Sequence, residues 1–275
     1  MPADDRHLSR IALLIEYNGS RFCGSQYQAG VRTVQGELEA ALGILARQPV
    51  TAIFAGRTDS GVHASGQVVH CDWPYPEPDL WRLAWAINGI VKDDLCVVKA
   101  QRVPSSFHAR FSATARRYVY RIVNRPQRSA LLRSSHYFMP LQLSLDSMTA
   151  ALSCLCGSHD FAAFKSKSSD TVTSVCRVSQ AELLNLGEGL LEFWIGANHF
   201  VYNMVRIIVG TLIEIGLGKR EPESIACALS SGNRDQAGPT APAWGLCLNS
   251  VQYPDAYQLF ASEREENHLV RGPEI

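Results

Sequence analysis

The sequence lacks a net charge, a long apolar run and any low-complexity tract. Its 26 lysine and arginine residues are matched by 26 aspartate and glutamate residues, so the whole chain is not basic, as proteins that bind polyanions often are. Residues 1–10 are polar and contain no apolar stretch of the kind that a secretory signal requires. The most apolar stretch, residues 201–218, is interrupted by Arg206 and Glu214 and is too short to span a membrane. We therefore expect a folded cytoplasmic protein without a membrane segment.

Recognisable metal and cofactor motifs are also missing. The eight cysteines are scattered along a chain that is long enough to build a core without disulfides. Cys154 and Cys156 are closer together than the cysteines of a zinc knuckle, and no second Cys or His pair lies near them in the sequence. The sequence has neither a P-loop nor the glycine pattern of a dinucleotide-binding domain. We expect reduced cysteines, no metal and no cofactor.

Acidic residues are absent from one long segment. No Asp or Glu occurs between Leu95 and Leu145. The basic residues of this segment are Lys99, Arg102, Arg110, Arg116, Arg117, Arg121, Arg125, Arg128 and Arg133. A segment with charge of one sign indicates a surface that binds a polyanion. The alternative is a basic face that only contacts solvent.

The first 104 residues have the pattern β-α-β-β-α-β. Short apolar runs predict strands over residues 11–17, 50–55, 66–72 and 95–103. Thr33 is a predicted N-cap, and the apolar residues after it, from Val34 to Leu45, have helical spacing. A second helix is predicted to begin near Asp79 and to end at Gly89.

The same order recurs after Pro104. Strands are predicted over residues 115–123, 173–184, 190–197 and 245–253, and helices over residues 145–155 and 201–216. We therefore predict an α+β fold of two ferredoxin-like β-α-β-β-α-β halves, whose antiparallel sheets carry helices on one face and flank a catalytic cleft. The predicted boundaries are residues 1–104 and 105–254, followed by a tail over residues 255–275.

A polar loop with the sequence GRTDSGVHA, residues 56–64, separates the two middle strands of the first half. Loops held by rigid strands are common sites of catalysis. The guanidinium of Arg57 is expected to lower the pKa of the Asp59 carboxyl, and an ionised carboxylate acts as a nucleophile or a base. The alternative is that Arg57 and Asp59 form a pair that only stabilises the loop.

This loop lies in the segment GRTDSGVHASGQVVH, residues 56–70, which strongly resembles the GRTDAGVHA segment of the tRNA pseudouridine synthase A (TruA) family. The resemblance continues in register. The further segments are EYNGSRFCGSQ from Glu16, FHARFSATARRYVYRI from Phe107, NHFVYNMVRIIVGTLIEIG from Asn198 and TAPAWGLCL from Thr240. The chain departs from the family pattern at Asn18, where YDG is usual, and at Ser25, where GWQ is usual.

The resemblance implies a homodimeric enzyme with the pseudouridine synthase fold. Its activity would convert uridine to pseudouridine in the anticodon stem-loop of tRNA, at positions 38 to 40, with Asp59 as the catalytic carboxylate. The reaction breaks the bond between N1 and the ribose, turns the base over and rejoins it through C5, so no cofactor is needed. Whether Asp59 adds to the base, traps the ribose or deprotonates the sugar stays open.

Two further residues are candidates for catalysis. Arg206 lies on an otherwise apolar helix, where a buried guanidinium needs an anionic partner, and the resemblance pairs it with Asp59. The alternative is an Arg206 side chain that extends to solvent. Tyr118 lies on a predicted strand, where its ring can stack on the base and its phenol can take part in removing the C5 proton. The alternative for Tyr118 is simple packing in the core.

A uridine inside a stem must be extruded before it can react. Arg57 is a candidate for filling the vacated position or for holding the flanking phosphate, and Leu246 for an apolar wall of the base pocket or for an ordinary core position. His63 is interpreted as structural, because the reaction does not require a histidine base. The remaining RNA-binding candidates are Gln67, His108, Arg110 and Arg116, the last as part of the basic segment.

Two other functions fit parts of the sequence. A noncatalytic tRNA-binding or remodelling protein would use the basic segment and the sheet aromatics, with Asp59 only organising a loop. That interpretation lacks support from any aromatic string typical of an RNA-recognition motif. An aspartyl-phosphate phosphotransferase would need a phosphate-binding glycine loop, which the sequence lacks.

Overall fold

A ten-stranded sheet runs along the molecule in the computed structural model, which describes residues 8–166 and 173–260. The strands are β1 (Ser9–Tyr17), β2 (Ile53–Phe54), β3 (His63–Trp73), β4 (Leu95–Arg102), β5 (Ala115–Asn124), β6 (Tyr137–Met139), β7 (Gly157–Asp160), β8 (Val175–Asn185), β9 (Leu190–Ala197) and β10 (Leu246–Gln252). The helices are α1 (Val34–Ala46), α2 (Leu80–Asn88), α3 (Leu145–Leu152), α4 (Met204–Gly216) and α5 (Ser224–Ser231). The predicted α+β class is confirmed, with a sheet that is mostly antiparallel.

Strand order is the same in the two halves of the sheet. In the first half the order is β4-β1-β3, with β2 beside β3, and every one of these pairs is antiparallel. In the second half the order is β10-β5-β9-β8, again antiparallel throughout, and β7 extends the edge. We number the four main strands of each half along the chain, which are β1 to β4 in the first half and β5, β8, β9 and β10 in the second. In both halves the order across the sheet is then fourth, first, third, second.

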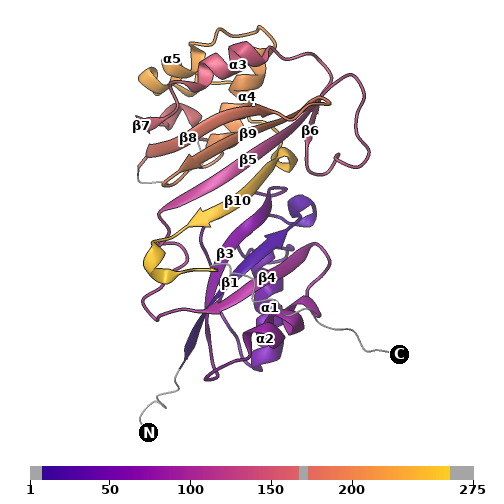
Figure 1. Ribbon diagram of the computed structural model, residues 1–275, viewed down its shortest axis with the longest axis vertical. Coiled ribbons are helices and arrows are strands. Elements are labelled where there is room, and N and C mark those ends of the chain that lie inside the picture. Colours follow the sequence, from indigo (N-terminus) through magenta and orange to yellow (C-terminus); the bar gives the residue numbers. More distant parts are fainter. Residues whose placement is uncertain (1–7, 167–172, 261–275) are drawn as a thin grey trace, which may run out of the picture.

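The two halves join edge to edge through β3 and β10, as Figure 1 shows at the middle of the sheet. These strands are parallel, and they pair Cys247 with His63 and Leu248 with Ala64. Close to this pairing, a Cβ atom on Gly66 would lie only 2.1 Å from the Asn249 carbonyl oxygen. Glycine at position 66 therefore permits the backbones of the two halves to approach each other.

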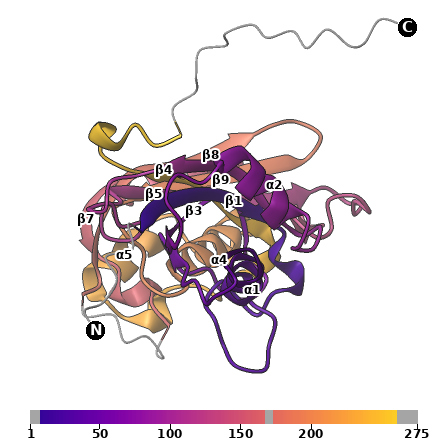
Figure 2. The same cartoon turned by 90° about the horizontal axis from the view of Figure 1, so that it is seen from below.

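The helices cover one face of the sheet and make the larger core with it. Figure 2 shows α1 and α4, from different halves, on the same side, with residues 254–260 on the opposite side. The larger buried cluster includes Leu38 of α1 and Ile207 of α4. A smaller cluster on the other face has Val68 and Phe107 at its centre and packs against Tyr257 and Phe260. Catalytic groups from both halves can therefore meet on the helical face.

Several predicted elements are confirmed with adjusted ends. Thr33 caps α1 by accepting a hydrogen bond from the Gly36 N–H, and Asp79 caps α2 in the same way with Arg82. β3 begins at His63 rather than at residue 66, and α4 begins at Met204 rather than at residue 201. The strand predicted over residues 50–55 is reduced to β2, and β6, β7 and α5 were not predicted.

The predicted tail does not begin as a separate segment. Its residues 255–260 pack against the first half, where the Phe260 N–H donates to the Gln101 side chain at 2.6 Å; residues 261–275 lie outside the described residues. All eight cysteines are unpaired, as predicted. None of the helices in the described part of the chain is both long and apolar enough to cross a membrane.

Candidate active site

The loop that the sequence predicts to carry the catalytic carboxylate, residues 56–62 and named the catalytic loop for that prediction, leads into β3 at the junction between the two halves. It passes close to the turn that follows β1. A Cβ atom on Gly19 would lie 2.0 Å from the Val62 carbonyl oxygen, so this contact requires glycine. The Val62 N–H donates to the Asp59 carbonyl at 3.1 Å, which closes a tight turn around Asp59.

Residue 58 fixes the backbone immediately before Asp59. The Ser25 Oγ accepts a hydrogen bond from the Thr58 N–H at 2.8 Å, and the Ser25 N–H donates to the Thr58 carbonyl at 3.0 Å. The Thr58 hydroxyl bonds to the Tyr17 hydroxyl at 2.8 Å inside the core. Three hydrogen bonds from two other segments therefore set the position of the catalytic loop.

His63 links the loop to both halves of the molecule. Its Nδ1 accepts a hydrogen bond from the Gly19 N–H at 3.0 Å, so its Nε2 carries the proton and donates to the Trp244 carbonyl, also at 3.0 Å. Burial lowers the pKa of His63, which favours the neutral ring that these two bonds need. The geometry agrees with a structural role for His63.

Asp59 and Arg206 form an ion pair across the junction. The Asp59 Oδ2 lies 3.2 Å from the Arg206 Nη1, and the two side chains are 24% and 18% exposed, respectively. Burial raises the pKa of the Asp59 carboxyl, and the positive charge of Arg206 offsets part of this increase. Arg206 therefore favours the ionised form of a carboxylate whose burial favours the protonated form.

The Arg206 guanidinium is held by its own half of the molecule. Its Nε donates to the Ala241 carbonyl at 2.8 Å, and its Nη1 donates to the Asn203 Oδ1 at 2.8 Å. Asn203 precedes α4 in the left-handed conformation, with φ of 64°, which asparagine tolerates better than most residues. The Asn203 Nδ2 donates in turn to the Ser166 hydroxyl. Sequence analysis did not identify Asn203 as an orienting residue.

Tyr118 lies on β5, between β10 and β9, and is 8% exposed. Its ring packs edge-on against Phe200, with the ring centroids 5.0 Å apart. Burial raises the pKa of Tyr118 strongly, and the nearby charge of Asp59 contributes to the increase. The phenol is therefore neutral at physiological pH, so it is suited to donating a hydrogen bond rather than to acting as a strong base.

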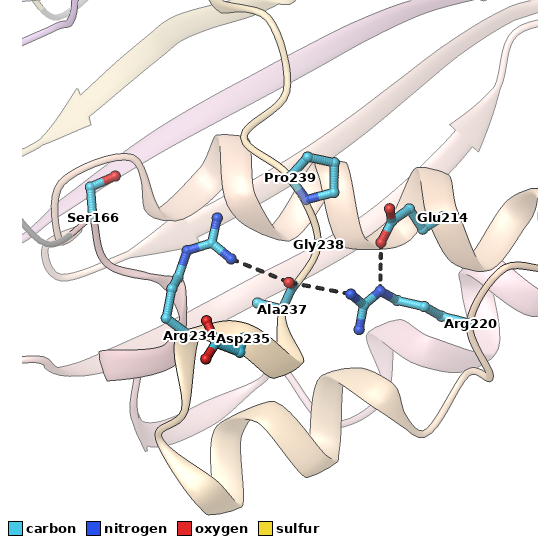
Figure 3. A pocket seen from close by; sticks show the side chains of 8 residues that line it. All are labelled: Ser166, Glu214, Arg220, Arg234, Asp235, Ala237, Gly238 and Pro239. Carbon is cyan, nitrogen blue, oxygen red and sulfur yellow. Dashed lines mark hydrogen bonds and ion pairs between the residues drawn. The ribbon is translucent and has the colours of Figure 1, made fainter.

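A hollow of about 560 Å³ lies beside α4 and is lined by Ser166 at one end and Glu214 at the other (Figure 3). Arg220 and Arg234 point into it, but Glu214 and Asp235 line it as well, so its charges balance. A second hollow, of about 580 Å³, lies on the opposite face of the sheet under residues 253–260. Asp59 lines neither hollow. The catalytic cleft stays a prediction.

Comparison with known proteins identifies the family. A model of the tRNA pseudouridine synthase family matches residues 13–112 and 151–254. The chain belongs to this family. The prediction that the protein is an isomerase acting on uridine in tRNA is therefore confirmed, and the segments that resemble the TruA family lie mainly within the matched residues.

Individual relatives agree with this assignment. A tRNA pseudouridine synthase A from Bacillus pumilus is 41% identical over 246 residues, which cover 89% of this chain and 99% of the relative. A protein of the same name from Anoxybacillus flavithermus is 44% identical, with coverage of 90% and 99%. A solved archaeal box H/ACA ribonucleoprotein complex is 11% identical over 74% of this chain and 43% of its own, with a TM-score of 0.34, too low to support a conclusion.

The pairing of Asp59 with Arg206, which the resemblance implied, is confirmed, whereas the local pairing of Asp59 with Arg57 is not formed. Arg57 is exposed, and the ion pair of Asp59 in the described residues is with Arg206. The expected decrease in the pKa of Asp59 was also wrong. Burial raises this pKa by more than the positive charge of Arg206 lowers it, so the net shift is upward. Arg57 therefore has its side chain available for another partner.

The Arg116 side chain is occupied by protein carbonyls. Its Nη2 donates to the carbonyls of Ala55 and Arg110, both at 2.8 Å, and its Nη1 donates to the carbonyls of Asn198 and Ala113 at 2.9 and 3.4 Å. These carbonyls belong to segments from both halves. Arg116 thus connects the start of the catalytic loop to the segments before β5 and after β9.

Gln67 and Leu246 also face the interior. Gln67 is fully buried and donates to the Gly56 carbonyl at 2.9 Å, while its Oε1 has no partner in the described part of the chain. Leu246 is 6% exposed and pairs with Tyr120 in the sheet register. In the absence of RNA, Gln67 supports the catalytic loop and Leu246 belongs to the core.

His108 and Arg110 lie together on the turn between β4 and β5. His108 is half-buried and Arg110 is exposed. The structure thus brings Asp59, Arg206 and Tyr118 to the junction and leaves Arg57 and Arg110 exposed. It buries Gln67 and Leu246 and gives Arg116 carbonyl partners.

Proposed function

We propose that the protein converts uridine to pseudouridine in the anticodon stem-loop of tRNA, at positions 38 to 40, with Asp59 as its catalytic carboxylate. The observation that carries this proposal is the ion pair between Asp59 and Arg206, which joins a loop of the first half to a helix of the second. We infer that these halves are ferredoxin-like, which the equivalent strand orders support. The enzyme acts as a cytoplasmic homodimer.

Asp59 must be ionised in each of its three possible first steps. Addition to the base and trapping of the ribose both need a nucleophilic carboxylate, and deprotonation of the sugar needs a basic one. Arg206 favours the charged form and fixes the Oδ2 atom, since its own guanidinium is held by Ala241 and Asn203. Its role is to orient and ionise Asp59.

Tyr118 contributes a neutral phenol next to this pair. Its ring offers an apolar surface for the uracil, and its hydroxyl makes no hydrogen bond to the described residues that would have to be broken first. The Tyr118 ring can keep contact with the released uracil while the uracil is reoriented so that its C5 faces the ribose. The phenol takes part in removing the C5 proton by passing its own proton to solvent water as it accepts the proton from C5, so it is neutral before and after the step.

Extrusion of the uridine requires groups that replace its lost stacking and hold the flanking backbone. The exposed side chain of Arg57, two residues from Asp59, is suited to either task. Arg110 and other exposed arginines of the acid-free segment contact phosphates and set the register of the RNA.

Tritium release from unmodified tRNA labelled with [5-³H]uridine tests the proposal. The intact protein should release tritium, and Asp59→Ala should abolish release while keeping its fold and its affinity for tRNA. Ser60→Ala, a change at an exposed neighbour in the same loop, is the matched control and should retain release. Tight binding by the intact protein without release would contradict the proposal and favour a noncatalytic tRNA-binding protein.

Two further measurements test the finer parts of the proposal. Transcripts in which uridines at positions 38, 39 and 40 are replaced one at a time should lose the tritium that each position contributes. Release that persists when all three are replaced would exclude these positions. Sedimentation equilibrium should give twice the mass of the chain, and a monomer at the concentrations used for activity would exclude a functional homodimer.

A further inference from the structure

Phe111 is a large aromatic side chain that the fold leaves exposed. It lies on the turn between β4 and β5, and 77% of its surface is accessible. Its ring stacks on the imidazole of His108, with centroids 4.4 Å apart and an interplanar angle of 29°. The guanidinium of Arg110 lies 5.6 Å from the ring centroid. Phe111 therefore has support from two side chains but no partner that buries it within the described residues.

The turn that presents Phe111 is rigidly held. His108 and Ser112 exchange two hydrogen bonds, from the Ser112 N–H to the His108 carbonyl at 2.9 Å and from the His108 N–H to the Ser112 Oγ at 3.0 Å. The Ala109 N–H donates to the His70 Nδ1, and the Ala109 carbonyl accepts from the Tyr253 hydroxyl at 2.6 Å. A ring on such a turn loses little conformational entropy when it binds a ligand.

His108 is suited to support the ring as a neutral imidazole. Its Nδ1 accepts hydrogen bonds from the N–H groups of Arg110 and Phe111, both at 3.2 Å, which requires that this nitrogen carry no proton. Burial lowers the pKa of His108, and the positive charges of Arg10 and Arg110 lower it further. Stacking between His108 and Phe111 therefore persists across the physiological pH range.

The turn is tied directly to the start of the catalytic loop. A single nitrogen of Arg116, Nη2, donates to the carbonyl of Arg110 and to the carbonyl of Ala55 at 2.8 Å each. Ala55 precedes the first residue of the loop that carries Asp59. The turn that carries Phe111 and the loop that carries Asp59 are therefore joined through one side chain.

The charge around Phe111 favours an RNA strand as its partner. No acidic residue occurs between Leu95 and Leu145. The carboxylate of Asp72 acts on His70, which contacts this turn, and Arg10 neutralises that carboxylate with two hydrogen bonds. An aromatic ring beside unpaired arginine is a common arrangement in proteins that bind single-stranded nucleic acid.

We propose that Phe111, stacked on His108 and flanked by Arg110, is a platform on which an unpaired base of the tRNA stacks while a neighbouring uridine occupies the active site. The proposal rests on tRNA being the substrate. The base contributes its face, so recognition at Phe111 does not depend on base identity. Arg110 contributes a phosphate contact next to the stacked base.

Affinity for unmodified tRNA as a function of salt concentration tests the platform. Stacking of one base contributes about 1 to 3 kcal/mol, so Phe111→Ala should weaken binding roughly 5- to 150-fold. The slope of the logarithm of tRNA affinity against the logarithm of salt concentration should be the same for Phe111→Ala and the intact protein, because loss of an uncharged ring changes no contact with phosphate. Phe111→Tyr should restore affinity, whereas Arg110→Gln should lower the slope by about one.

Trp81→Ala is the matched control, since Trp81 is an aromatic residue of α2 that is 67% exposed. It should bind tRNA like the intact protein. An unchanged affinity for Phe111→Ala, an equal loss for Trp81→Ala, or a change in the salt slope of Phe111→Ala would each overturn the platform. A shift of Phe111→Ala to a smaller species in sedimentation would overturn it in favour of a protein interface.

These outcomes are separate from a failure of the proposed catalytic function. Binding is measured without turnover, and tritium release by the intact protein is measured on the same tRNA. Loss of affinity in Phe111→Ala together with no release by the intact protein would leave the platform standing and refute the synthase. Tritium release by the intact protein together with unchanged affinity in Phe111→Ala would support the synthase and refute the platform.

Discussion

The Ser25 Oγ lies 2.8 Å from the backbone nitrogen of Thr58, the residue that precedes the proposed catalytic residue Asp59. Ser25 is 1% exposed, and its own N–H donates to the Thr58 carbonyl at 3.0 Å. Position 25 departs from the pattern of the TruA family, in which tryptophan is usual. In this chain the small hydroxyl side chain has a defined task, because it satisfies a buried backbone N–H of the catalytic loop.

Ser25→Ala should therefore affect both stability and catalysis. The change leaves the Thr58 N–H without its acceptor, and an unsatisfied buried donor costs about 1 to 3 kcal/mol. We expect a free energy of unfolding in urea that is lower by this amount, and a decrease in kcat with little change in KM, since Asp59 loses its fixed position. Ser60→Ala, which removes only the hydrogen bond from the exposed Ser60 to the Phe22 carbonyl at 3.2 Å, is the comparison and should lower the free energy of unfolding by less. Equal stability of Ser25→Ala and the intact protein would contradict this account.

Removal of the Arg206 charge should shift the pH dependence of catalysis. Burial raises the pKa of Asp59 and Arg206 opposes this effect, so Arg206→Met should raise the pKa of Asp59 further. Because Asp59 acts in its ionised form, the acid limb of the kcat profile should move to higher pH. The tritium-release rate at saturating tRNA between pH 5 and 9 measures the shift.

Arg57→Met provides the comparison for this experiment. Arg57 is exposed and forms no ion pair with Asp59, so its loss should leave the acid limb in place even where tRNA binding weakens. An acid limb that moves with Arg57→Met and stays with Arg206→Met would show that Arg57, rather than Arg206, sets the pKa of Asp59.

Much of the fold was accessible from sequence because its signals are local. Thr33 and Asp79 mark helix starts through short-range hydrogen bonds, and both caps form as predicted. The order of strands and helices followed from apolar spacing in the same way. β7 could not be recognised, because its sequence GSHD has no apolar alternation and the strand depends on pairing with β8.

The partners within the site depend on the tertiary fold. Arg57 is two residues from Asp59, yet Arg206, 147 positions away in the sequence, forms the ion pair. Sequence proximity could not distinguish between them, since the direction of each side chain depends on how the halves meet. The exposure of Phe111 was not predicted either, because it depends on which aromatic residues the folded core buries.

Acid should destabilise the protein through His70, which is 2% exposed. Burial, with smaller contributions from Arg10 and His108, lowers the pKa of His70 to about 4, and Asp72 acts in the opposite direction. In the unfolded chain the pKa of histidine is about 6.5. Between these values the unfolded state binds a proton that the folded state does not, so the free energy of unfolding falls as the pH falls. The contribution of neutral His70 to the free energy of unfolding is therefore fully present above a pH of about 6.5.

His70→Asn removes this titrating group and keeps an acceptor for the Ala109 N–H, which bonds to the His70 Nδ1 at 3.1 Å. Urea unfolding at several pH values from 7.5 to 4.5 should show a weaker loss of stability on acidification for the variant. The stability of the intact protein relative to the variant should therefore stay constant above about pH 6.5 and fall as the pH is lowered to 4.5. Parallel curves for the two proteins would show that His70 does not titrate on unfolding in this range.

The two neighbouring arginines at positions 110 and 116 should separate RNA binding from stability. Arg116 donates to four backbone carbonyls from both halves, and a hydrogen bond to a charged group contributes about 1.5 to 3 kcal/mol. Arg116→Met should lower the free energy of unfolding by roughly 3 to 5 kcal/mol, allowing for non-additivity. Arg110→Met, at an exposed position, should change it by less than about 0.5 kcal/mol while weakening tRNA binding.

Arg116→Lys distinguishes geometry from charge at the same position. Lysine keeps the positive charge, but its single ammonium cannot reach carbonyls that the planar guanidinium contacts through two nitrogens. We expect this variant to be nearly as unstable as Arg116→Met in urea, with the salt dependence of tRNA binding unchanged. If Arg116→Lys were as stable as the intact protein, or if Arg116→Met lowered the salt slope without loss of stability, Arg116 would be an RNA contact rather than the link between the Phe111 turn and the catalytic loop.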